Sequence, residues 1–96
     1  VVEWMTSSEQ DTLGFRVLRS ATGSREDAAP AGAGVIAATG GSNAAAYTYA
    51  DSGLQSDVTY TYWLQELDTS GAVASEYALG GGRVLALRMY LPKLAR

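Results

Sequence analysis

The chain lacks the two side chains on which much protein chemistry depends: among its 96 residues there is no cysteine and no histidine. Without cysteine it can form neither a disulfide nor a thiolate nucleophile. Without histidine it has no imidazole metal ligand, and it loses the residue most often used as a general base. We therefore expect no enzyme, no catalytic residue, no cofactor site and no metal site.

Long apolar runs and helical periodicity are also missing. No stretch of about 18 apolar residues occurs, so no transmembrane helix is expected. Apolar residues do not recur at the i, i+3, i+4, i+7 spacing of an amphipathic helix. The sequence contains instead short segments in which apolar and polar residues alternate, separated by Gly, Ser and Asp. This pattern predicts a single all-β domain.

Acidic and basic residues are unevenly distributed: basic residues are few before residue 83, and acidic residues are absent after it. Residues 83–96 hold four basic and no acidic side chains, which leaves 7 − 4 = 3 basic and 10 acidic residues before them, a formal charge of 3 − 10 = −7. An acidic body lacks the basic face that nucleic-acid binding requires, so we expect no nucleic-acid partner. The body and the basic tail should attract each other.

The composition leans on Ala, Gly, Ser, Thr and Tyr and includes one lysine, Lys93. This is the profile of an exported β-protein. We therefore expect the chain to be extracellular or on the cell surface.

Period-two alternation marks the expected strands. The clearest pattern runs over residues 58–67, where Tyr60, Tyr62 and Leu64 alternate with other side chains. The turn sequence at 68–71 follows it and predicts a hairpin into a strand over 72–79. Further strands are expected at residues 1–5, 15–19 and 46–49, with a short one at 35–36.

Two segments carry a family resemblance. Residues 54–64, LQSDVTYTYWL, resemble the tyrosine corner of fibronectin type III domains, with Leu54 six residues before Tyr60. Residues 4–20, WMTSSEQDTLGFRVLRS, resemble the segment from strand B to strand C in the fibronectin type III-like repeats of secreted bacterial proteins. The resemblance implies an immunoglobulin-like antiparallel β-sandwich over residues 1–79. It also implies a set of core residues: Trp4, Phe15, Val17, Leu54, Tyr60, Tyr62 and Leu64.

The chain departs from that family at both ends. Only three residues precede Trp4, too few for the first strand, A, of a complete module. At the other end an extra segment, VLALRMYLP at residues 84–92, follows Gly80, Gly81 and Gly82. We expect the three glycines to form a hinge and residues 83–96 to form a C-terminal extension. In an extended strand Leu85, Leu87, Met89 and Leu91 share one face, and Val84, Ala86, Arg88 and Tyr90 share the other.

Four buried apolar side chains at about 1.5–3 kcal/mol each contribute on the order of 6–12 kcal/mol, so the extension should not lie in water. Its partner is its own sandwich, a neighbouring copy or another protein. We expect the neighbour, because about three flexible glycines make the return to the same sandwich awkward. The predicted function is a structural subunit of an extracellular filament or surface fibre. Its partners are copies of itself, and it polymerises head to tail through the predicted assembly strand: Val84, Leu85, Leu87, Met89, Tyr90 and Leu91.

Other interpretations stay open. The chain could be a spacer, or a carbohydrate- or protein-binding module of a larger secreted protein, or a monomer whose tail completes its own sandwich. An aromatic sugar-binding platform would use Trp63, Tyr47, Tyr49 and Tyr77. A calcium site would use Glu66, Asp68 and Glu76, although their spacing matches no calcium loop.

Overall fold

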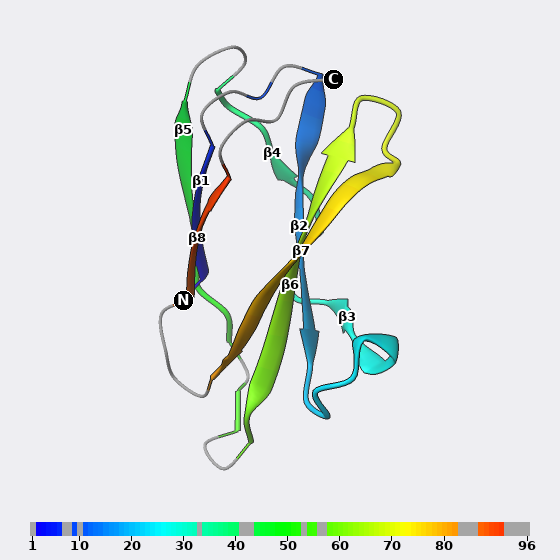
Figure 1. Cartoon of the computed structure of the whole chain (residues 1–96), viewed down its shortest axis with the longest axis vertical. Helices are drawn as coiled ribbons and strands as arrows, with labels where there is room; N and C mark the ends of the chain where they lie inside the picture. The colour runs from blue at the N-terminus through cyan, green and yellow to red at the C-terminus, as the bar shows by residue number, and fades with distance from the viewer. Residues whose placement is uncertain are drawn as a thin grey trace.

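The chain folds as an all-β sandwich in a computed structural model, which confirms the predicted fold class. The structure describes residues 2–6, 9, 11–32, 34–40, 44–52, 54–55, 58–82 and 87–91, and for 80–82 and 87–91 it describes the backbone. Within these ranges no helix is long and apolar enough to cross a membrane. Figure 1 shows the two sheets side by side along the long axis of the molecule.

The first sheet has three strands in the order β5–β1–β8. Its central strand, β1 (Val2–Thr6), pairs antiparallel with β5 (Ala45–Tyr49). On its other side β1 pairs in parallel with β8 (Leu87–Leu91), which comes from the far end of the chain. All other pairings in the molecule are antiparallel, so β8 is the one exception to the predicted antiparallel sandwich among the described residues.

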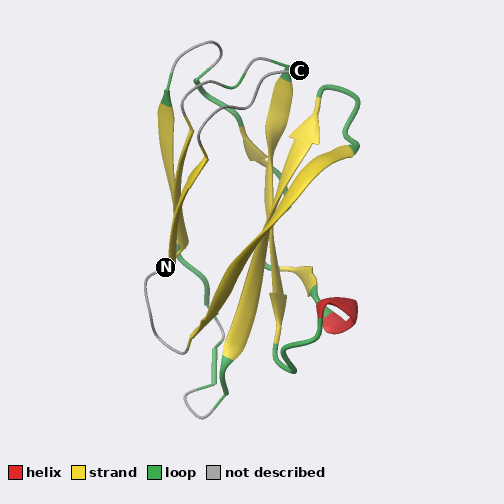
Figure 2. Cartoon of the chain, in the orientation of Figure 1, coloured by secondary structure: helices red, strands yellow, loops and turns green. Residues whose placement is uncertain are grey.

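The second sheet is built around the long strands β2 (Thr12–Ser20) and β6 (Tyr60–Asp68). The strand β7 (Val73–Gly82) forms one edge of this sheet. Two short strands pair with opposite ends of β2 on its other side: β3 (Ala29–Pro30) and β4 (Ile36–Ala37). A three-residue 3₁₀ turn, η1 (Arg25–Asp27), connects β2 to β3 and is the red coil in Figure 2.

The predicted hairpin at residues 68–71 joins β6 to β7. The Asp68 carboxylate accepts hydrogen bonds from the backbone N–H groups of Ser70 and Ala72, at 2.9 and 3.1 Å. Gly71 has a φ of 88°, in the left-handed region that glycine adopts most readily. An aspartate that bonds its own turn and a following glycine account for the chain reversal.

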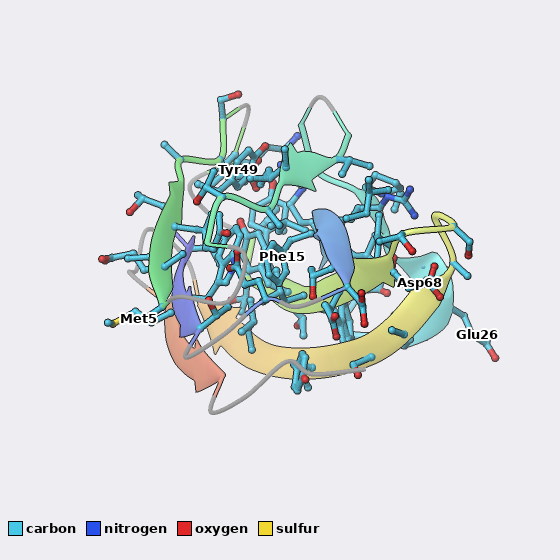
Figure 3. All side chains as sticks on the ribbon, turned by 90° about the horizontal axis from the view of Figure 1, so that it is seen from above. Met5, Phe15, Glu26, Tyr49 and Asp68 are labelled. Carbon is cyan, nitrogen blue, oxygen red and sulfur yellow. The ribbon has the colours of Figure 1, made fainter. Side chains whose placement is uncertain are left out.

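The hydrophobic core lies between the two sheets and has an aromatic centre. Phe15 of β2 is fully buried, and Figure 3 shows it near the middle of the sandwich. Six of the seven residues predicted to form the core are buried there, and Leu54 packs against them as a partly buried neighbour. The six are Trp4, Phe15, Val17, Tyr60, Tyr62 and Leu64.

The predicted glycine hinge is wrong. Gly80, Gly81 and Gly82 are the last three residues of β7 and pair with Tyr62, Thr61 and Tyr60 of β6. Sheet pairing uses backbone groups alone, and a neighbouring aromatic ring can cover a glycine in a strand. β7 ends at Gly82 and β8 begins at Leu87, and residues 83–86 between them lie outside the described residues.

Gly14 gives a test of the packing between β2 and β4. A Cβ at this position would lie 2.8 Å from Val35 Cγ1 and would collide with the backbone carbonyl of Ile36. Gly14→Ala should therefore lower the free energy of unfolding by about 1–3 kcal/mol, the usual cost of overpacking. Urea denaturation followed by tryptophan fluorescence measures the change.

Ala37→Ser is the matched control, because Ala37 is the exposed residue that pairs with Gly14 and also gains one heavy atom. Equal stability of Gly14→Ala and Ala37→Ser would contradict the close contact between β2 and β4.

Candidate functional site

The strand β1 presents alternate residues to the core and to solvent. Val2, Trp4 and Thr6 are buried, each with 1% or less of its surface exposed, whereas Met5 is 50% exposed. Figure 3 shows the Met5 side chain directed away from the sandwich. Both edges of this five-residue strand are paired, one with β5 and the other with β8.

The register of β8 on β1 follows the predicted apolar pattern. Leu87, Met89 and Leu91 are in register with the three buried residues of β1, and Arg88 and Tyr90 are in register with Glu3 and Met5. The pair is parallel, whereas the sequence predicts an antiparallel sandwich. Val84 and Leu85, the first two residues of the predicted assembly strand, lie outside the described residues.

The expectation that the tail cannot easily return to its own sandwich is wrong, because β8 pairs with β1 of the same chain. The connection from Gly82 to Leu87 contains 87 − 82 − 1 = 4 residues. At about 3.3–3.6 Å per residue this connection reaches well beyond the spacing of about 10 Å between packed sheets. The return is short because the C-terminal end of β7 and the start of β1 lie toward the same end of the sandwich (Figure 1).

Trp4 fixes the middle of β1 in the core. Its ring stacks on Tyr47 with centroids 5.3 Å apart and meets Phe15 edge-on at 5.6 Å. Tyr47 and Phe15 are also in contact, with centroids 5.0 Å apart. Contacts of this kind add about 0.5–1.5 kcal/mol per pair to the burial of the rings. The strand that accepts β8 is therefore held by both sheets.

A buried carboxylate fixes the C-terminal end of β1. Glu9 is 2% exposed and accepts hydrogen bonds from Thr6 Oγ1 and the Gly40 N–H, both at 2.7 Å, and from the Tyr47 hydroxyl. The Tyr47 oxygen in turn accepts a hydrogen bond from the Thr39 N–H at 2.9 Å. Burial, together with the hydrogen bond to Glu9, raises the pKa of Tyr47. The network ties β1, β5 and the loop before β5 together.

A second polar cluster lies around Asp51, at the start of the loop after β5. Asp51 accepts hydrogen bonds from Arg19 at 2.9 Å and from the Tyr62 hydroxyl at 2.8 Å. Burial of Asp51 favours its neutral form, but these two hydrogen bonds outweigh burial and lower its pKa. Burial and the same carboxylate raise the pKa of Tyr62. Because Arg19 and Tyr62 both donate hydrogen bonds to Asp51, the cluster connects β2 and β6 to this loop.

Tyr60, the central residue of the predicted tyrosine corner, is buried in β6. The Tyr60 hydroxyl accepts a hydrogen bond from the Gln55 N–H at 2.9 Å, five residues upstream, while its ring lies in the core. Arg19 covers this ring, with its guanidinium carbon 5.1 Å from the ring centroid.

The residues of the alternative sugar platform are not brought together. Tyr47, Tyr49 and Tyr77 all belong to or pack against the core. Trp63 lies on β6, and its ring packs beneath Arg25. The guanidinium carbon of Arg25 is 5.9 Å from the centroid of the Trp63 ring.

Each carboxylate of the alternative calcium site has a different partner. Glu66 is buried and accepts a hydrogen bond from Thr12, Asp68 closes the hairpin, and Glu76 pairs with Arg25 at 2.8 Å. In the described part of the chain no group of three potential ligands is placed to hold a metal ion.

Comparison with protein families, with curated proteins and with solved structures finds no match. The candidate site is therefore the edge of β1 that pairs with β8. Sequence reasoning missed Glu9 and Asp51, which stabilise opposite ends of this region. Both sit in polar loop segments where a carboxylate usually faces solvent, and no local signal separates them from their exposed neighbours.

Tyr47→Phe tests the network at the end of β1. Removing the hydroxyl leaves the buried Glu9 carboxylate without one donor, so the free energy of unfolding should fall by about 1–3 kcal/mol. Chemical denaturation measures the loss. Tyr77→Phe is the control, since no hydrogen bond of its hydroxyl is found among the described residues, and an equal loss in both variants would contradict the role of the network.

The pair between Arg25 and Glu76 predicts a pH dependence. The hydrogen bonds from Arg25 and Gln65 lower the pKa of Glu76 from 4.5 to about 2. A carboxyl group with a lowered pKa in the folded state stabilises the protein above its ordinary pKa, and that stabilisation is lost as the pH falls. The difference in stability between the wild type and Glu76→Gln should therefore be constant above about pH 5.5 and shrink between about pH 4.5 and pH 2.

The effect should be small because the pair is largely exposed to solvent. Glu26→Gln serves as the control, since Glu26 is exposed and points away from the sandwich (Figure 3). A pH-independent difference for Glu76→Gln would rule out the proposed coupling.

Proposed function

We propose that this chain is a structural subunit of an extracellular filament or surface fibre, and that it polymerises by donating β8 to β1 of a neighbouring copy. The observation that carries the proposal is the pairing of β8. Among the described residues this strand pairs with β1 only, in a register that aligns its Leu and Met positions with the buried residues of β1. The edge of β1 can therefore accept the tail of another copy through the same contacts.

Exchange of an identical element between copies is a low-cost route to assembly, because the strand makes the same contacts with either partner. The four residues between β7 and β8 and the protein concentration then set the balance between the closed monomer and the assembled form. The closed chain is the precursor in this scheme, and opening it frees both a donor strand and an acceptor edge.

The resemblance to fibronectin type III domains supports the same proposal. We assign β1, β2, β6 and β7 to strands B, C, F and G of such a module, with Tyr60 at its tyrosine corner. In sandwiches of this type strand A lies beside strand B. β8 lies beside β1 and so takes the place of strand A, although it runs parallel to β1.

Charge favours the approach of a tail to a second copy. Two of the three basic residues in the body are already paired with carboxylates, Arg19 with Asp51 and Arg25 with Glu76. The body therefore keeps an acidic surface, and the four basic residues of the tail are attracted to it. Such steering raises association rates and weakens with added salt. We assign no catalytic step to the chain.

The second candidate is a self-complemented module, a spacer or binding domain of a larger secreted protein. The observation that favours it is that β8 completes the sheet of its own chain. This candidate predicts a monomer at all concentrations.

The position of the exchange site limits the assemblies that can form. The donor strand leaves and the acceptor edge begins toward the same end of the sandwich (Figure 1). Two chains that exchange tails reciprocally form a closed dimer, whereas non-reciprocal exchange is a heterologous contact and continues as a filament. Electron microscopy separates these two products.

Two substitutions at neighbouring positions of β8 test the proposal. Met89→Asp places a charge at the position in register with buried Trp4, whereas Tyr90→Asp places it in register with exposed Met5. The proposal predicts uniform filaments of the wild type by negative-stain electron microscopy, none for Met89→Asp, and filaments for Tyr90→Asp. The cost of burying an unpaired charge causes the difference.

Isolated wild-type particles at every concentration would overturn the filament and leave the self-complemented module. Filaments that persist in Met89→Asp would show that assembly does not use β8.

A further inference from the structure

A different edge of the first sheet carries a second interaction surface. β5 ends the sheet order β5–β1–β8, and among the described residues β1 is the only strand that pairs with it. Figure 1 shows β5 at the outer margin of the molecule, with no described strand beyond it. The outer edge of β5 therefore offers backbone N–H and C=O groups for pairing.

The other edges carry the features that block edge-to-edge pairing in natural sheets. β7 is interrupted by two irregularities in its register with β6, where Leu79 and Ala74 are the extra residues. β3 and β4 are two residues long, and β3 contains Pro30. The sequence of β8 includes Arg88. Bulges, short strands, proline and charge all act against pairing with another chain.

β5 has none of these features. Its register with β1 is unbroken over five residues, and the stretch AAAYTYA at residues 44–50 contains no charged residue, proline or glycine. Tyrosine and threonine favour strands, and an uncharged segment without proline is prone to pair with a copy of itself. The edge is thus regular and unprotected.

The strand is also held rigidly, which lowers the cost of pairing. Tyr47 hydrogen-bonds to Glu9 and Thr39, and Tyr49 packs against the core, so both tyrosines hold β5 to the rest of the domain. The residues between and beside them, Ala46 and Thr48, are exposed and small. They present neither charge nor bulk to an approaching strand.

We propose that β5 pairs antiparallel with β5 of a second copy about a two-fold axis. The partner is a second copy because the segment is regular, uncharged and small on its exposed face, and so is complementary to itself. A two-fold contact of this kind is closed and needs no other component. It joins the two three-stranded sheets into one continuous sheet. In the proposed filament it links neighbouring filaments laterally, and without filaments it produces a dimer.

The absence of cysteine allows a direct test in the full-length chain. Ala46→Cys and Thr48→Cys each introduce a unique thiol on the exposed side of β5, and Thr69→Cys places the control thiol in the exposed β6–β7 turn. Under mild oxidation at micromolar concentration, disulfide-linked dimers should form at position 46 or 48 severalfold faster than at 69. Equal rates at all three positions, or no dimer at 46 and 48, would overturn the proposal.

A charge on the edge gives the second arm of the test. Thr48→Lys in the Ala46→Cys background should slow dimer formation severalfold, because lysine on an edge strand opposes pairing. Thr48 is in register with Glu3 on β1, so the lysine is compatible with the fold, and circular dichroism checks this. Thr69→Lys in the same background should leave the rate of dimer formation unchanged. Equal slowing by both lysines would contradict pairing through the β5 edge.

The crosslink is read at β5 and does not depend on exchange of β8. Crosslinking without filaments would therefore support the β5 contact and reject the proposed function, and filaments without crosslinking would do the reverse.

Discussion

The structure depends on the pairing of β1, a five-residue strand that forms the centre of a three-stranded sheet. Its buried residues, Val2, Trp4 and Thr6, connect the first sheet to the aromatic centre of the core. A two-stranded sheet of this length is marginally stable in water, so the third strand decides whether the sandwich is complete. That strand is β8, from the far end of the sequence.

This constraint links fold to function. Any chain that supplies a strand with apolar residues at alternate positions can complete the sheet, and the tail of a second copy is identical to the tail that does so within one chain. Burial of the apolar positions favours pairing, and the backbone entropy of about 1–2 kcal/mol per ordered residue opposes it. Both terms are alike within one chain and between chains. The geometry of the connection, the protein concentration and charge therefore decide between the closed monomer and the assembly.

Period-two alternation predicted the all-β fold class, and the family resemblance supplied the core set, of which Trp4, Phe15 and Leu64 are buried on strand faces. The backbone register of β8 on β1 sets Leu87, Met89 and Leu91 beside the buried residues of β1, as the alternation in the tail suggests. Alternation could not predict that β8 runs parallel to β1, since direction depends on where β7 ends relative to β1.

Features that depend on distant contacts were predicted less well. Gly80, Gly81 and Gly82 have the local properties of a hinge, yet pairing with β6 holds them in a strand. Glu9 and Asp51 are polar loop residues in the sequence, and only the fold brings Tyr47 to one and Arg19 to the other.

The central claim is that β8 of one copy pairs with β1 of another. Solid-state NMR on the assembled protein, prepared from a mixture of ¹⁵N-labelled and ¹³C-labelled chains, tests it most directly. The account predicts magnetisation transfer between chains that joins Val2–Thr6 to Leu87–Leu91, with Trp4 opposite Met89. Assembled material in which these two strands contact each other only within single chains would contradict it.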